Sequence, residues 1–489
     1  MKQQSPAHPT EPIISLFTAI QVYFGWGILI FAGHVRDFLR EIFFKKSSAP
    51  EGYAPIVSDF EDFYSRRAYG RIHENFNVPI SSAASAHIKV VERERVTGPT
   101  GYTMKLRETG RLIDCLNLGS YNYLGFGDAD SPTREPVLEV LNQYGVSTAS
   151  PRSQLGTTKL HDDLEKLVAR FVGKESAMIF GMGFGTNSSG LPALAGPGTL
   201  IISDANNHSS IVIGARSSGA KIAVFKHNNM ADLENVIRRS IVQGQPRTHR
   251  PWKRIMIVVE GIYSMEGEMC SLPEIVALKK KYKCHLYVDE AHSIGAVGPT
   301  GRGVCDFFGV DPADVDVLMG TFTKSFGAVG GYVAADAKVI DYLRYHCFGS
   351  LYSASISPPA CMQIISAIKI IMGEDGTDLG KKKLQSIYDN ANFFREELRK
   401  AKFHVLGDTG SPVVPVMLYI PSKIKAFGVE CRKRNMAVVV VGYPATPILL
   451  SRVRFCLSAA HTREDLKKAV EKIVEIGDLL SMRYDLSSL

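Results

Sequence analysis

The sequence predicts an α/β fold in which helices cover both faces of a mostly parallel β-sheet. From about residue 112, short apolar runs alternate with stretches of helical periodicity, an alternation that builds parallel sheets. The apolar runs lack strict polar alternation, which is typical of strands buried on both faces. In chain order they are ESAMIF, TLIISD, KIAVFKH, RIMIVVE, HLYVDEAH, VDVLMGTF and GGYVAAD. Ligands of such sheets bind at the carboxyl ends of the strands.

The chain of 489 residues is too long for one small domain. Changes in composition and in hydrophobic periodicity along it divide it into five segments. Long helical patterns at 379–402 and 462–482, with short strands at 413–419 and 437–441, predict a smaller C-terminal α+β domain. The predicted segments are an N-terminal lead (1–12), a membrane segment (13–34), an N-terminal arm (35–110), a large α/β domain (111–370) and the small domain (371–489).

One segment near the N-terminus is long and apolar enough to be a membrane helix. Residues 13–33 contain no charged residue, and a helix needs roughly 20 apolar residues to span a bilayer. A cleaved signal peptide is disfavoured because Glu11-Pro12, not a basic stretch, precedes the segment. A buried or interfacial helix stays open as the alternative. Basic residues follow at 36, 40, 45 and 46 but precede it only at Lys2, so the positive-inside rule places the remaining chain in the cytosol.

The composition argues against nucleic-acid binding and against an oxidising compartment. The net charge is +8, but lysines and arginines are scattered rather than gathered into a block that interleaves with aromatic residues. The eight cysteines lie far apart and form no CxxC pair, which is typical of reduced thiols.

A lysine within a glycine-rich loop is the strongest candidate for chemistry. In GTFTKSFGAVGG (320–331), glycines and small residues surround Lys324 after a predicted strand. A lysine that forms a Schiff base must reach into a pocket and lose its proton part of the time, and small neighbours let the backbone approach a planar cofactor. A solvated loop lysine is the alternative. A Walker-type phosphate loop is disfavoured because its GxxxxGK[ST] spacing is not met at Lys324.

The tetrapeptide DEAH places a carboxylate and an imidazole at the end of the strand HLYV. Asp289 at a strand's carboxyl end can keep a ring nitrogen protonated, which makes that ring an electron sink. His292 lies three residues further on and can reach the same ligand. The helicase motif of the same spelling is disfavoured because the chain has no Walker-A sequence to accompany it.

Two further turns follow predicted strands. FGMGFGTN (180–187) precedes a helix, where the backbone at Gly183 and Phe184 can hold a phosphate, although a plain tight turn is the alternative. In SDANNHSS (203–210), His208 begins a helix and its flat imidazole can stack on a planar ring, although a lone histidine is more often a cap or a core residue.

These motifs together resemble the α-oxoamine synthase family of fold-type I pyridoxal 5'-phosphate (PLP) enzymes. The family's order is met throughout about residues 110–480, including SYNYLGF, GTTKLHDDLE, EGIYSMEG, YSASISPP and RVRFCLSAAHT. The resemblance implies PLP as the cofactor, held as a Schiff base on Lys324. The other implied roles are Asp289 on the pyridinium nitrogen, His208 stacked on the ring, His292 on the ring oxygen, Ser264 close to the cofactor, Thr321 on the phosphate and Arg454 on the substrate carboxylate.

Within the family, TASPRSQLGTTKLH, GTFTKSFGAVGGY and VGYPATP resemble the eukaryotic serine palmitoyltransferases. That resemblance implies a membrane-bound acyltransferase of the endoplasmic reticulum, with a cytosolic catalytic domain, that condenses L-serine with a long-chain acyl-CoA. It also implies a heterodimer with a homologous subunit that lacks the lysine, and small regulatory membrane subunits.

Two positions depart from the family pattern. Soluble bacterial relatives carry a substrate-binding arginine where this chain has Gly442-Tyr443. The phosphate segment reads YSAS, so Ser353, Ser355 or a neighbouring subunit must supply the hydroxyl. Two alternatives stay open. Another α-oxoamine synthase, forming 5-aminolevulinate, 8-amino-7-oxononanoate or 2-amino-3-ketobutyrate, is disfavoured by residues 13–33. A non-catalytic partner of the same fold is disfavoured by Lys324.

Overall fold

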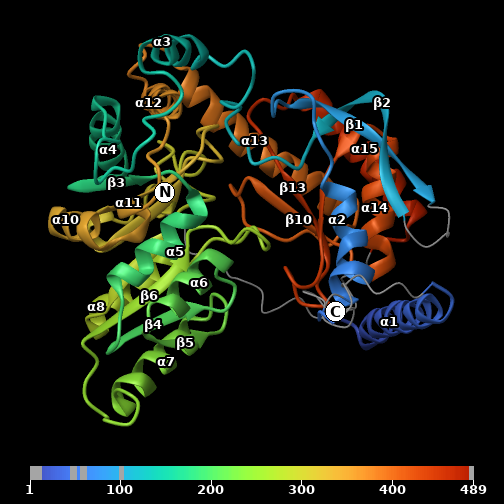
Figure 1. The fold of residues 1–489 in the computed structure, drawn as a ribbon, viewed down its shortest axis with the longest axis horizontal. Helices are drawn as coiled ribbons and strands as arrows, with labels where there is room; N and C mark the ends of the chain where they lie inside the picture. Colours follow the sequence, from blue (N-terminus) through green and yellow to red (C-terminus); the bar gives the residue numbers. More distant parts are fainter. Residues whose placement is uncertain (1–13, 45–51, 55–62, 98–103, 484–489) are drawn as a thin grey trace.

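A seven-stranded sheet forms the centre of the large domain in this computed structural model, which describes residues 14–44, 52–54, 63–97 and 104–483. The strand order is β3-β9-β8-β7-β6-β4-β5 (Figure 1). Neighbours from β5 to β8 run parallel, whereas β9 is antiparallel to both β3 and β8. The expected mostly parallel sheet is therefore confirmed. Its strands are β3 (Ser176–Phe180), β4 (Thr199–Asp204), β5 (Lys221–Phe225), β6 (Arg254–Glu260), β7 (His285–Asp289), β8 (Val317–Thr321) and β9 (Gly331–Ala335).

Both faces of this sheet are buried, because alternate residues of a strand point to opposite sides. In β3, Ala177 and Ile179 join one core cluster, whereas Met178 and Phe180 join the other. Burying a side chain of the size of Ile, Met or Phe stabilises a fold by about 1.5–3 kcal/mol, which explains why the strands read as nearly continuous apolar runs. The first cluster is covered by α3 (Arg134–Tyr144), α4 (Lys159–Val172), α7 (Met230–Gln243), α8 (Leu272–Tyr282), α9 (Val304–Phe308) and α12 (Pro358–Ile371), and the second by α5 (Gly183–Leu194), α6 (Ser209–Ser217) and α10 (Ala337–His346).

The C-terminal part of the chain forms a second lobe. Its antiparallel sheet has the order β10-β13-β12, with β10 (Val413–Met417), β12 (Val439–Val441) and β13 (Arg452–Cys456). The helices α13 (Leu379–Lys400), α14 (Pro421–Lys433) and α15 (Arg463–Leu479) belong to this lobe (Figure 1). The expected strand 437–441 is split in two, because β11 (Met436–Ala437) pairs with a different sheet from β12.

A long hairpin joins the N-terminal part of the chain to this lobe. Its strands β1 (His87–Thr97) and β2 (Met104–Asn117) are antiparallel, and β2 pairs in parallel with β11. The domain boundary expected between residues 110 and 111 therefore falls inside β2. Before the hairpin, a π-helical turn (Ser65–Tyr69) continues into α2 (Gly70–Phe76), which packs against α14.

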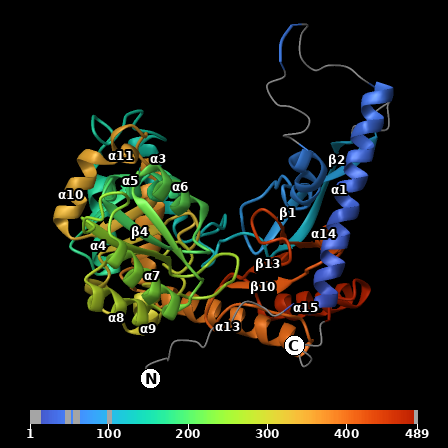
Figure 2. The same cartoon turned by 90° about the horizontal axis from the view of Figure 1, so that it is seen from below.

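The N-terminal helix α1 (Leu16–Phe44) lies along the C-terminal lobe (Figure 2). Its Leu16–Leu39 stretch is long and apolar enough to cross a membrane. One stripe is docked, because Val22 and Trp26 are buried against Met417 and Tyr419. Large apolar side chains elsewhere on α1 are exposed, including Leu16, Phe17, Phe24, Phe31 and Phe38. The predicted lead (1–12), Ile13, Lys45 and Lys46 lie outside the described residues.

Candidate active site

The carboxyl ends of three neighbouring strands bring the candidate residues together. Glu260 at the end of β6 is in register with Asp289 at the end of β7, and Thr321 ends β8 next to them. Lys324 follows three residues after β8. Parallel strands end at the same edge of a sheet, which explains why motifs far apart in the sequence meet here.

Lys324 is held in a protein environment that favours its neutral amine. Burial lowers the pKa of Lys324 to about 8, against the opposing charges of Asp289 and Glu260, and Arg454 lowers it further. Its Nζ atom lies 5.5 Å from the centroid of the Tyr121 ring. The loop after β8 is anchored next to the lysine, because the Ser325 hydroxyl donates to the Ile294 carbonyl at 2.7 Å.

Asp289 is buried, and both of its carboxylate oxygens accept hydrogen bonds. The Asn187 side-chain amide donates to Oδ2 at 2.7 Å, and the Ala291 backbone N–H donates to Oδ1 at 2.9 Å. Asn187 is itself fixed, because the Tyr287 hydroxyl donates to its Oδ1 atom at 2.7 Å. These bonds set the orientation of the Asp289 side chain. Sequence reasoning missed Asn187, although it ends the glycine-rich motif and is a polar residue on a buried helix face.

His292 is buried beside Asp289's strand end and shares a 2.8 Å hydrogen bond between its Nδ1 atom and the Tyr123 hydroxyl. Burial holds the pKa of His292 well below its ordinary value, and the positive charges of Lys324 and Arg454 lower it further. The imidazole is therefore neutral at physiological pH. Tyr123 was also missed, and its place in SYNYLGF was the available signal.

His208 caps α6 at the same edge. Its Nδ1 atom accepts from the Ser210 backbone N–H at 3.2 Å, and its own backbone N–H donates to the buried carboxylate of Glu260. The His208 residue is exposed, and its ring lies 6.0 Å from that of Phe184 in an edge-to-face arrangement. Partial desolvation by the surrounding protein lowers the pKa of His208 despite the opposing charge of Asp289. The ring is therefore neutral, and part of it remains accessible.

The start of α5 lies against Thr321. A Cβ atom at Gly183 would approach the Thr321 Oγ1 atom to 2.6 Å, so glycine is required for this close approach. The Thr321 hydroxyl donates to the Gly330 carbonyl at 2.9 Å and lies 2.8 Å from the Thr323 hydroxyl. The first N–H groups of a helix have no intrahelical partner, and they attract anions. Gly183 and Phe184 therefore begin a helix beside Thr321, and their binding of a phosphate stays a prediction.

Two buried arginines of β13 differ in what they bind. Arg452 donates from Nη1 to the Met265 carbonyl at 2.7 Å and from Nε to the Leu450 carbonyl at 3.0 Å, so it is engaged within the chain. The Arg454 guanidinium lies 4.7 Å from the Tyr121 ring centroid, and its buried Nε atom has no hydrogen-bond partner among the described residues. Its Nη1 atom lies 3.8 Å from the Met265 Sδ atom, and the role of Arg454 as a carboxylate clamp stays a prediction.

Four further positions that the sequence singled out have distinct surroundings. Ser264 is buried in the turn after β6, and its role stays a prediction. A Cβ atom at Gly442 would lie 3.1 Å from the Ile424 side chain, so this position faces packed residues. The Ser355 hydroxyl donates to the Ser150 carbonyl at 3.0 Å, whereas Ser353 is exposed.

Comparisons with known proteins place the chain in a family. The model of the aminotransferase class I and II family matches residues 113–473. The chain belongs to this family. It is 57% identical over 468 residues to the long chain base biosynthesis protein 2d of Oryza sativa subsp. japonica, covering 96% of this chain and 95% of that protein. It is 48% identical over 489 residues to the serine palmitoyltransferase 3 of Homo sapiens, covering 99% and 86%.

Solved structures of family members agree with the fold. The Sphingomonas wittichii serine palmitoyltransferase has a TM-score of 0.75 with 27% sequence identity, covering 88% of this chain and 100% of that chain. A serine palmitoyltransferase solved with PLP as an internal aldimine has a TM-score of 0.75 and 26% identity over the same shares. Together with the family match, these structures indicate PLP as the cofactor.

The residues present fit PLP on three observations. A buried lysine has a lowered pKa, the approach of Gly183 to Thr321 leaves no space for a Cβ atom, and a buried guanidinium nitrogen of Arg454 lacks a partner. Lys324 offers an amine to the carbonyl group of PLP, and the N-terminus of α5 offers N–H groups to its phosphate. Asp289 offers a carboxylate to its ring nitrogen.

Proposed function

We propose that the protein is the catalytic subunit of a serine palmitoyltransferase, a PLP-dependent acyltransferase that condenses L-serine with palmitoyl-CoA, releasing CoA and CO₂ and forming 3-ketosphinganine. The observation that carries the proposal is the convergence of Lys324, Asp289 and Arg454 in a chain 57% identical to a long chain base biosynthesis protein 2d. A non-catalytic partner of the same fold is disfavoured, because such a chain would not need a buried lysine with a lowered pKa.

Each residue has a task that its surroundings suit. PLP, when bound, supplies an electron sink that stabilises negative charge on the serine α-carbon. Lys324 takes the α-proton on Nζ and returns it later, which its pKa of about 8 permits near neutral pH. Asp289 would hold a proton on the ring nitrogen, and hydrogen bonds from Asn187 and Ala291 orient its carboxyl group for this task. Arg454 binds the serine carboxylate, which fits a planar guanidinium.

The neutral histidines act by position. His208 offers a flat ring face against which the cofactor ring can stack, and its backbone is tied to Glu260. His292 is oriented by Tyr123, and its other ring nitrogen would contact the cofactor's oxygen. Thr321 and the start of α5, which lie against each other, would bind the phosphate.

We also propose that α1 anchors the protein in the endoplasmic reticulum membrane, with the catalytic domain in the cytosol. The exposed apolar side chains of α1 and the apolar Leu16–Leu39 stretch support this proposal. The buried stripe of Val22 and Trp26 would hold the catalytic lobe close to the membrane, where a long-chain acyl-CoA partitions.

The assembly that we propose is a heterodimer with a homologous subunit that lacks the lysine, joined by small regulatory membrane subunits. Ser355 is engaged within this chain, whereas Ser353 is exposed and free to face a neighbour. A homodimer is the simpler arrangement for soluble proteins.

The decisive experiment purifies the protein from native membranes, identifies the co-purifying chains and assays acyl-CoAs of graded length with serine, glycine or alanine. We expect serine and long acyl chains to give the ketone, identified by mass. Preference for glycine with a short acyl-CoA would contradict the proposal and favour another α-oxoamine synthase. The chain purified alone as a homodimer should be much slower than the native complex, and an equal rate would contradict the heterodimer.

A further inference from the structure

The strand β5 leaves one edge of the large sheet open. It is the last strand of the sheet and pairs only with β4 in the described part of the chain. The Phe225 carbonyl accepts from the Ala205 backbone N–H at 3.0 Å, on the β4 side. Because backbone groups alternate along a strand, Ile222 and Val224 direct their N–H and C=O groups to the open side. Val224 is 58% exposed. Such an edge is a template for pairing with another strand.

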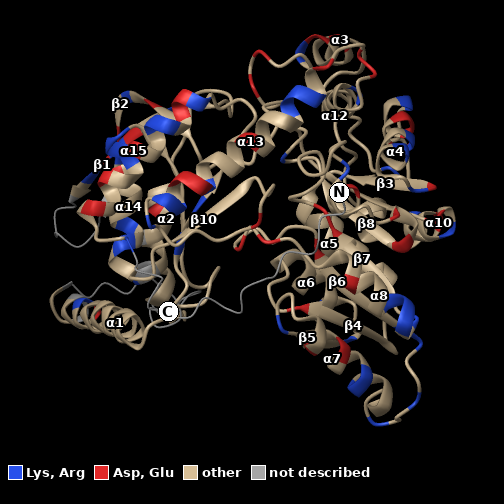
Figure 3. Ribbon diagram, turned by 180° about the vertical axis from the view of Figure 1, so that it is seen from behind, with Lys and Arg blue, Asp and Glu red and all other residues tan. Residues whose placement is uncertain are grey.

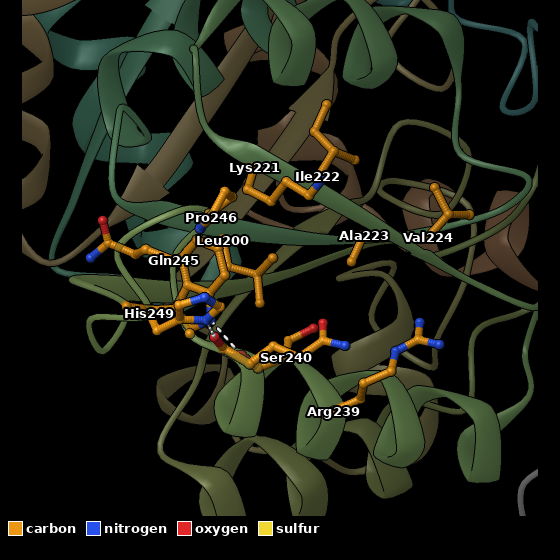
Figure 4. A pocket seen from close by; sticks show the side chains of 13 residues that line it. Leu200, Lys221, Ile222, Ala223, Val224, Arg239, Ser240, Gln245, Pro246 and His249 are labelled. Atoms are coloured by element: carbon orange, nitrogen blue, oxygen red, sulfur yellow. Dashed lines mark hydrogen bonds between the residues drawn. The ribbon is translucent and has the colours of Figure 1, made fainter.

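A groove lies next to this edge, between β5, the end of α7 and the loop of residues 244–252 (Figure 4). Its volume is about 610 Å³, and an adjoining hollow of about 510 Å³ shares Lys221, Gln245, Pro246 and Trp252 with it. The apolar part of the lining consists of Leu200, Ile222, Ala223, Val224, Pro246 and Trp252. None of the lining residues belongs to the candidate active site.

The loop that closes the groove is fixed by its own hydrogen bonds. The Gln245 backbone N–H donates to the Arg250 carbonyl at 2.8 Å, and the Trp252 indole donates to the Ser240 carbonyl of α7 at 2.7 Å. Arg247 and His249 adopt φ values of +67° and +51°. Such backbone conformations cost energy in residues other than glycine and are found where a segment is held in one shape. The groove is thus preformed.

The charge around the groove is of one sign. Its two hollows are lined by Lys221, Arg239 and Arg247, and no Asp or Glu is among the lining residues that the structure describes. Arg250 in the same loop and Lys253 directly after it are exposed. Lysines and arginines follow the end of α7 and this loop in Figure 3. A ligand here meets positive charge beside an apolar floor and an open row of backbone donors and acceptors.

We propose that this groove binds an extended acidic peptide segment of a partner protein, which adds to β5 as a further strand. Backbone hydrogen bonds to Ile222 and Val224 give affinity, the apolar side chains on one face of the added strand contact Trp252, and the basic loop that contains Arg247 and Arg250 attracts the negative charge of the segment. A second copy of this chain would bring two basic edges together, and like charges repel. Nucleic acid and anionic lipid would satisfy the charges but leave the open strand edge unused.

The test uses the full chain, purified with its co-purifying subunits, and a fluorescent peptide that alternates glutamate with valine. Fluorescence anisotropy should detect binding that weakens as salt is raised. Arg247→Glu combined with Arg250→Glu should weaken binding about tenfold or more, since two attractions become repulsions. The matched control, Lys166→Glu with Lys381→Glu, reverses two exposed charges outside the groove and should leave binding unchanged.

A separate variant at Val224 tests whether the peptide pairs with β5 as a strand. Val224→Pro removes the outward N–H and should also weaken peptide binding about tenfold, whereas Val224→Thr keeps the N–H and should not. A peptide methylated on alternate backbone nitrogens should fail to bind. PLP absorbance and turnover, which the groove does not serve, report that each variant is folded.

Three outcomes would overturn the proposal. Binding that survives both Val224→Pro and backbone methylation would show a purely electrostatic attraction. A lack of peptide binding, with Arg247-dependent and Arg250-dependent binding of a single-stranded oligodeoxythymidylate or of phosphatidylserine vesicles, would assign the groove to another ligand. Equal loss in the Lys166 and Lys381 control would show that net charge alone matters.

Discussion

Replacing Asn187 tests whether the orientation of Asp289 is set by a residue that no motif singled out. Asn187 is 1% exposed, and its amide donates to Asp289 Oδ2 at 2.7 Å and to the Ser210 hydroxyl at 3.0 Å. Its carbonyl oxygen accepts from the Tyr287 hydroxyl at 2.7 Å. The variant Asn187→Ala leaves Asp289 with a single hydrogen bond, from Ala291.

The expected loss follows from the bond that is removed. A hydrogen bond to a charged group contributes about 1.5–3 kcal/mol. Because about 1.4 kcal/mol corresponds to a factor of ten, kcat/KM should fall about 10- to 150-fold if the bond acts fully in the transition state. Asn187→Asp should lose more, because a second carboxylate beside Asp289 raises the pKa of one of the pair.

The assay must separate positioning from folding. The control Asn390→Ala removes a buried amide that donates to the Ser458 and His461 carbonyls at 3.1 and 2.9 Å, far from Asp289 in the sequence and in another lobe. Both variants should melt at lower temperature, but only Asn187→Ala should weaken PLP binding and shift the pH profile of kcat/KM. A folded Asn187→Ala enzyme with unchanged kcat/KM and pH profile would refute the reasoning.

Four further predictions follow from the site and the core. Lys324→Ala should abolish turnover and the borohydride-trapped cofactor link while membrane attachment persists; turnover near the wild-type rate would remove the lysine from the mechanism. The rate at which the apoenzyme takes up PLP should rise with pH up to about 8 and then level off, because the neutral amine reacts; a flat profile in stopped-flow absorbance would contradict this. Arg454→Lys should raise the KM for serine about tenfold, whereas Arg452→Lys should lower the melting temperature with KM unchanged. Burial lowers the pKa of His461 from 6.5 to about 4, so the unfolded state binds the proton at a higher pH than the folded state does. The free energy of unfolding should therefore fall by up to roughly 3 kcal/mol as the pH drops from 6.5 to 4. Denaturant melts of His461→Gln should lack this dependence.

The candidate site could be predicted where a residue and its local pattern are enough. Lys324 is set in a glycine-rich loop after a strand, and Asp289 ends an apolar run, so each could be identified from a few neighbours. Asn187 and Tyr123 could not, because their importance lies in partners 102 and 169 positions away. A buried polar residue in a motif shows only that it has some partner, and the fold decides which one.

The sequence by itself determined the strands of the large sheet and the apolar N-terminal helix. It also showed that most of these strands are parallel. Strand and helix periodicities are local, and burial on both faces leaves continuous apolar runs that can be read directly. It could not distinguish the hydrogen-bond partners of Arg452 from those of Arg454, because both are arginines on the same strand.

Only the tertiary structure decided those features that depend on what packs beside them. It assigned Arg452 to backbone carbonyls and left Arg454 with an unpartnered Nε atom. It split the expected strand at 437–441 between two sheets, and it made β5 an edge strand. The physical reason is that hydrogen-bond partners and sheet neighbours are chosen by the whole fold, whereas a sequence pattern reports only whether a position is buried.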